Sequence, residues 1–162
     1  MRDNIYLKEK MEAIWREHFS DVERPNEIHI LFGRYSKRRL ASIRQIRRRD
    51  KSSDTIIHMT QYFKDEAVPE YVIEATIGHE LCHYVHGFAS PLSQLTRHPH
   101  RGSLVDNELK KRGLGSQLKL QNQWLKESWP TLIGDDIIRK PRIRRRYRRK
   151  SPLIRLLEKF VI

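Results

Sequence analysis

The chain has a single cysteine, Cys82, among its 162 residues. One cysteine excludes a disulfide framework, and it also excludes a zinc ribbon, which needs four cysteine ligands. We expect Cys82 to be a small buried apolar residue rather than a ligand. Long apolar runs are absent as well, and no stretch approaches the roughly twenty apolar residues of a membrane-spanning helix. With no apolar run of the signal-peptide type, we expect a cytoplasmic protein, either nucleoid-associated or, in a eukaryote, nuclear.

Acidic residues are few relative to basic ones, 20 against 33, which gives a net charge of +13. Nine basic residues lie between Arg34 and Lys51 with one acid, Asp50, and nine lie between Arg139 and Lys150 with none. Arginine predominates in both runs, and its planar guanidinium pairs bidentately with phosphate. Because Tyr147 adds a ring that can stack on bases, the runs favour nucleic acid as partner over the alternative of a solubilising surface or a disordered basic tail.

The segment His79-Glu80-Leu81-Cys82-His83 has the HExxH spacing. On a helix, residues four apart lie on one face, so His79 and His83 can bind one zinc ion. Glu80 is rotated by about a hundred degrees, which places its carboxylate beside the metal, where it can take a proton from water. The spacing therefore predicts a zinc metalloendopeptidase with Glu80 as general base. In the alternative, both histidines are core residues hydrogen-bonded to the backbone.

The flanking residues predict that the motif lies on a helix. Pro69 and Glu70 suit a first helical turn, and Gly87 suits the C-cap. The two histidines continue a mostly apolar face that should point inward, formed by Val72, Ala75 and Thr76.

Catalytic zinc takes three protein ligands, so one more ligand must come from elsewhere in the chain. His86 lies one turn beyond His83, and we expect it beside the site rather than on the metal. His98 and His100 lie in a turn-rich loop, and Glu108 lies on the next expected helix. Glu108 would give a gluzincin-like peptidase without an obligatory DNA role. His98 and His100 together would close the site around a structural zinc in a nucleic-acid-binding module.

From about Ile28 to Gly115 the chain resembles the SprT-like zinc metalloprotease domain family, which includes the DNA-dependent protease Spartan. The resemblance lies in the order of a strand over 28–32, a basic stretch and strand over 34–44, a strand over 54–59 and the HExxH helix. In that family the third zinc histidine sits in a loop, followed by a glycine and by an apolar residue that starts the next helix. His100-Arg101-Gly102-Ser103-Leu104 is similar, although its glycine is displaced by one residue and leucine replaces the usual aromatic.

The resemblance implies zinc ligands at His79, His83 and His100, with Glu80 as the catalytic residue. It also implies that the substrates are proteins associated with or crosslinked to DNA. For assistance at the oxyanion, Tyr84 and His86 are candidates by proximity.

The whole chain predicts an α+β domain over residues 1–138. We expect a small antiparallel or mixed three-stranded sheet packed on helices, with the zinc helix at the centre. The expected helices cover 4–19, part of 65–87, 103–112 and 117–128, and an extended segment covers 131–138. Residues 139–162 are expected to form a basic arm and a short amphipathic helix, and the sequence leaves the oligomeric state open.

Overall fold

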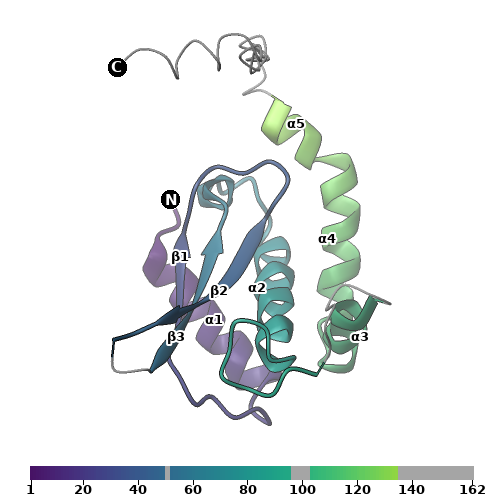
Figure 1. Ribbon diagram of the computed structural model, residues 1–162. Coiled ribbons are helices and arrows are strands. Elements are labelled where there is room, and N and C mark those ends of the chain that lie inside the picture. Colours follow the sequence, from purple (N-terminus) through teal and green to yellow (C-terminus); the bar gives the residue numbers. More distant parts are fainter. Residues whose placement is uncertain (50–51, 96–102, 135–162) are drawn as a thin grey trace, which may run out of the picture.

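The computed structural model describes residues 1–49, 52–95 and 103–134, and its core is a three-stranded mixed sheet. The strands are β1 (Ile28–Phe32), β2 (Ala41–Arg47) and β3 (Ser53–Met59), in the spatial order β1-β3-β2 (Figure 1). β1 is parallel to β3, and β2 is antiparallel to β3. The sheet and its helices confirm the predicted α+β class, in its mixed-sheet form.

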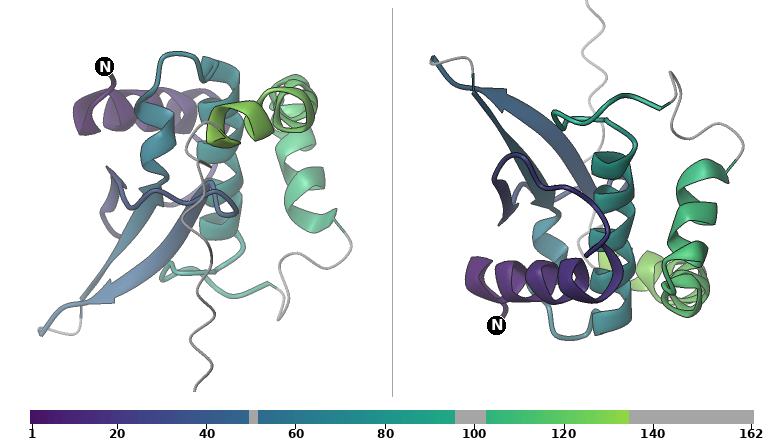
Figure 2. Two further views of the ribbon diagram at one scale, coloured as in Figure 1. Left: turned by 90° about the horizontal axis from the view of Figure 1, so that it is seen from above. Right: turned by 90° about the horizontal axis from the view of Figure 1, so that it is seen from below.

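Helices pack on one face of this sheet and extend beyond it. The helix α1 lies beside β1, and α2 contacts α1, β2, α3 and α4 (Figure 2). A 3-10 turn, η1, precedes α2, and a short helix, α5, follows α4. The bounds are α1 (Asn4–His18), η1 (Gln61–Lys64), α2 (Glu70–Val85), α3 (Leu104–Lys111), α4 (Gly115–Glu127) and α5 (Trp129–Gly134).

Alternating burial along β3 defines the two faces of the sheet. Thr55, Ile57 and Met59 are buried and face the helices. Apolar residues of β1 and of α1 are buried with them. The intervening residues Ile56 and His58 are only half-buried. They point to a face that no helix of the described residues covers (Figure 2).

Gly87 follows the end of α2, as predicted. Its φ of +77° lies in the left-handed region, its N–H donates to the Tyr84 carbonyl at 3.0 Å, and the Phe88 N–H donates to the His83 carbonyl at 2.9 Å. This is a Schellman motif, which satisfies carbonyls that the helix end would leave unpaired. The motif fixes the last turn of α2, where His83 lies.

The prediction of an extended segment from residue 131 is wrong for the part that the structure describes, because α5 is helical. Pro130 occupies the first turn of α5, where a missing N–H removes no helical hydrogen bond. Trp129 packs on Tyr62 and Phe63 with ring centroids 5.5 Å and 6.1 Å away, and its Nε1 donates to the Lys37 carbonyl at 3.1 Å. Tertiary packing therefore stabilises a helix that periodicity did not indicate.

The expected basic arm and C-terminal helix, residues 139–162, lie outside the described residues, as do residues 135–138. Within the described ranges, no helix has both the length and the apolar character needed to cross a bilayer.

Candidate metal centre

His79 and His83 lie one turn apart on α2, and their rings converge. The two Nε2 atoms are 3.2 Å apart, and the ring planes are nearly perpendicular at 76°. Two nitrogens bound at about 2.0–2.1 Å to one tetrahedral zinc would be separated by about 3.3 Å. The pair is therefore spaced as two ligands of one zinc ion would be.

Glu80 lies on the same turn with only 7% of its surface exposed. Burial raises the pKa of Glu80 to about 7, because desolvation disfavours the charged carboxylate, and the positive charge of Arg39 opposes this shift. A carboxyl with a pKa near neutrality can both accept and release a proton at physiological pH.

A cavity of about 680 Å³ opens beside these three residues. One wall comes from the start of β2 and the residue before it, over residues 40–43, and from Arg38 and Arg39 of the preceding connection. The opposite wall comes from α4, through Leu118, Gln121 and Asn122. We call this cavity the metal cleft; it brings together segments that are far apart in the sequence.

Gln121 holds α4 against α2 at the metal cleft. Its side-chain nitrogen donates to the Thr76 hydroxyl at 2.7 Å and to the Val72 carbonyl at 3.1 Å, and its side chain is buried. Thr76 lies one helical turn before Glu80. A buried amide with two good hydrogen bonds holds two helices together, so Gln121 fixes α4 against α2 at the cleft.

The candidates for a third ligand divide into two groups. His98 and His100 lie outside the described residues. Glu108 is described and does not line the metal cleft: its Oε1 accepts a hydrogen bond from Arg112 Nε at 2.8 Å, and its Oε2 lies 4.0 Å from His86 Nε2. The acid of α3 that does line the cleft is Asp106, which the sequence reading did not single out.

Neither residue expected near the oxyanion lines the cleft. Tyr84 is fully buried, and its hydroxyl donates to Asn26 Oδ1 at 2.7 Å. His86 lines a separate cavity with Glu108. Proximity in sequence did not identify residues of the cleft, because Tyr84 points to another side of α2. Arg39 lines the cleft from the connection before β2, far from the HExxH motif in the sequence. In the sequence, only its place in a basic run distinguished it.

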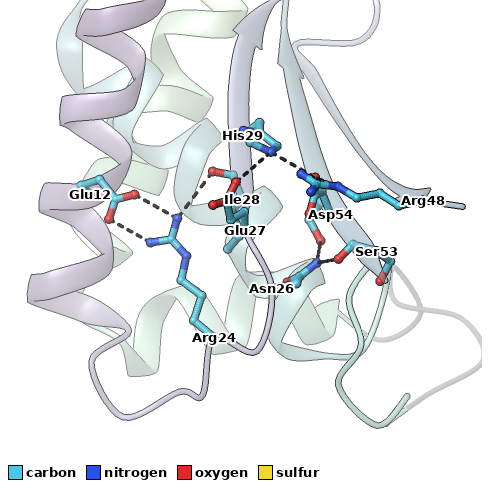
Figure 3. A network of polar contacts seen from close by, with 10 residues as sticks. Glu12, Arg24, Asn26, Glu27, Ile28, His29, Arg48, Ser53 and Asp54 are labelled. Atoms are coloured by element: carbon cyan, nitrogen blue, oxygen red, sulfur yellow. Dashed lines mark hydrogen bonds and ion pairs between the residues drawn. The ribbon is translucent and has the colours of Figure 1, made fainter. Parts of the chain in front are cut away.

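Across the described ranges, one group of three His, Cys, Asp or Glu side chains brings its ligand atoms within 4.8 Å: Glu27, His29 and Asp54. Figure 3 shows that Asp54 is also paired with Arg48, whose Nε donates to Asp54 Oδ2 at 2.8 Å. Glu27 and His29 are 74% and 41% exposed in their side chains. An arginine that already neutralises the acid, together with this exposure, makes the group a surface ion-pair network and a weak metal site.

No protein-family model, curated protein or solved structure matches this chain.

Proposed function

We propose that the protein is a zinc metallopeptidase of the SprT-like kind, which acts on proteins associated with or crosslinked to DNA. The observation that carries the proposal is the convergence of His79 Nε2 and His83 Nε2 at 3.2 Å beside the buried Glu80. In this proposal His79, His83 and His100 hold the metal. The basic runs around residues 34–51 and 139–150 support the DNA part.

Zinc bound at these histidines would supply a Lewis acid that activates water and polarises the scissile carbonyl. Glu80 takes the proton from the attacking water and delivers it to the leaving amine. Its position suits this role, because Glu80 is buried on the same turn of α2 as the two histidines and lines the same cleft. Arg39 lines the same cleft from the connection before β2. Its positive charge can orient the ionised carboxylate of Glu80.

The position of β2 supports a peptide as the substrate. This strand is hydrogen-bonded only to β3 in the described sheet, and its first residues line the metal cleft. An extended peptide can add to such an edge through main-chain hydrogen bonds, which do not depend on its sequence. Pairing along Ala41 to Ile43 would lay a peptide bond across the cleft beside Glu80.

The decisive variant is Glu80→Gln. It should keep stoichiometric zinc, because Glu80 is not a ligand, and should lose peptide hydrolysis by about a hundredfold to ten-thousandfold. Zinc content by mass spectrometry and turnover of a fluorogenic peptide measure the two properties. Glu74→Gln is the matched control on the same helix, since Glu74 pairs with Lys10 at 3.0 Å and does not line the cleft. Turnover retained in Glu80→Gln would remove Glu80 from the mechanism.

Alanine variants of the remaining ligand candidates separate the alternatives. We expect His100→Ala to lower zinc affinity far more than His98→Ala, Asp106→Ala or Glu108→Ala. A larger loss for His98→Ala would place the loop register two residues away. A loss for Glu108→Ala would support the gluzincin-like peptidase. Comparable losses for His98→Ala and His100→Ala, with no hydrolysis in the unaltered protein, would support a structural zinc.

A further inference from the structure

A second cavity, of about 810 Å³, lies next to the metal cleft and is strongly basic. We call it the arginine groove. Its floor includes His58 and Met59 of β3, and no acid lines it. Four arginines surround it, all with exposed side chains: Arg34, Arg38, Arg39 and Arg44. Arg38 and Arg39 line the metal cleft as well, so the two cavities share a wall.

Within the described residues, the groove arginines have no ion pairs with acids, in contrast to Arg24 and Arg112. Arg24 pairs with Glu12 at 2.8 Å, and Arg112 pairs with Asp21 at 2.7 Å. In the part of the chain that the structure describes, no ion pair joins an acid to any of the four groove arginines. Four guanidinium groups gathered without acids repel one another, and a bound anion would relieve that repulsion.

The loop that carries three of these arginines is held firmly against the sheet. The Ser36 N–H donates to Thr60 Oγ1 at 3.1 Å, and the Thr60 N–H donates to the Leu40 carbonyl at 2.8 Å. From the other side, Lys37 Nζ donates to the Ile133 carbonyl of α5 at 2.6 Å. These hydrogen bonds hold the loop in place, which lowers the entropy cost of ordering its backbone on binding.

We propose that the arginine groove binds the sugar-phosphate backbone of a nucleic acid and leads it past Arg38 and Arg39 to the rim of the metal cleft. The groove is too large for one phosphate, and its four arginines come from the loop before β2 and from β2 itself, so a linear polyanion can contact them with several phosphates at once. Every basic side chain in it except His58 is an arginine, whose fork matches phosphate oxygens. The delivery of a DNA-bound protein to the cleft rests on the proposed peptidase function; the binding itself does not.

The test is binding of a fluorescein-labelled oligothymidylate to the full chain, measured by anisotropy over a range of salt concentrations. The groove variant is Arg34→Ala/Arg44→Ala. The matched control is Arg16→Ala/Lys119→Ala, which removes the same charge from two exposed basic residues that lie outside both basic runs and line neither cavity. We expect the groove variant to bind roughly tenfold more weakly or worse, and the control to lose less than about threefold. The salt slope should fall by about 0.7 for each lost phosphate contact.

Equal losses in the two variants would overturn the proposal, because binding would then follow net charge and not the groove. Unchanged binding in the groove variant, or displacement of the oligothymidylate by polyglutamate of equal charge as readily as by unlabelled oligothymidylate, would do the same. If the alanine variant does not fold by circular dichroism, Arg34→Gln/Arg44→Gln replaces it. Absence of peptide hydrolysis in the unaltered protein would overturn the peptidase proposal and leave this one standing, because the assay measures binding alone.

Discussion

Burial separates the chemistry of neighbouring residues in the HExxH turn. Cys82 is fully buried, and this burial raises the pKa of its thiol to about 12. The raised pKa makes this thiol a poor nucleophile at neutral pH, because the thiolate is the reactive form. Glu80, two residues earlier, is also buried but lines the metal cleft, whereas Cys82 does not. The sequence reading of Cys82 as a small buried residue is confirmed.

His58 provides a titration test of the arginine groove. Burial and the charge of Arg44 lower the pKa of His58, because both disfavour the imidazolium. We expect Arg44→Gln to raise this pKa, though not fully to its ordinary value, since burial persists. Saturating oligothymidylate should raise it too, because phosphate favours the imidazolium. NMR titration of the imidazole signals measures both effects, and Arg47→Gln is the control.

The lowered pKa of His58 also makes the free energy of unfolding depend on pH. A histidine whose pKa is lowered on folding binds fewer protons in the folded state than in the unfolded state. The folded protein therefore loses stability from this group as the pH falls through the ordinary histidine pKa of about 6.5. A pKa of His58 that does not respond to Arg44→Gln would mean that the two side chains do not interact in solution.

At the scale of elements, Gly87 follows the end of α2 and Gly113 follows the end of α3, and the two differ in the space around a Cβ atom. Both glycines have positive φ, +77° and +83°. A Cβ on Gly87 would lie 2.5 Å from the Gln94 Cα and the Ser93 oxygen, whereas a Cβ on Gly113 would meet nothing closer than His18 Nδ1 at 3.6 Å. There is therefore no room for a side chain at Gly87 after α2, whereas there is room for one at Gly113 after α3.

We expect Gly113→Ala to lower the free energy of unfolding by about 1–2 kcal/mol, the cost of a left-handed alanine. Gly87→Ala carries this cost and a clash with backbone, so it should lose about 1–3 kcal/mol more. Urea unfolding of both variants, with zinc bound, measures the difference. Equal losses would show that the chain over residues 93–94 moves away at little cost.

The elements that the sequence predicted well are those with strong local signals. The bounds of α1 and α3 fall within one residue of the expected ones, because apolar periodicity and caps are local features. The order β1-β3-β2 was not predictable, since it depends on pairing between distant segments. For the same reason the motif predicted His79, Glu80 and His83 on one helix, but not the contributions of Arg39, Asp106 and Gln121 to the cleft.

At the scale of the whole molecule, the net charge of +13 is divided between the described domain and the basic run over 139–150. Deleting residues 139–162 should flatten the dependence of DNA affinity on salt, by about 0.9 per lost phosphate contact on duplex DNA. Zinc content and hydrolysis of a small peptide should persist, because the proposed ligands precede the deletion. Deleting residues 151–162 alone is the control and should keep the slope.

Weakened but measurable DNA binding should remain after the longer deletion, because the arginine groove is untouched. A truncated protein with the affinity and slope of the full chain would assign all binding to the groove. Loss of zinc from it would make residues 139–162 part of the folded domain.

The free edge of β2 also bears on how copies of the protein behave toward one another. An unpaired edge that can receive a peptide can equally receive the same strand of a second copy, which is a route to aggregation. Arg44 and Arg47 on this strand are exposed, so two β2 strands meeting edge to edge would bring like charges together. Salt screens that repulsion. With nucleic acid bound as proposed, rising ionic strength would therefore have two effects: release of the nucleic acid and promotion of self-association.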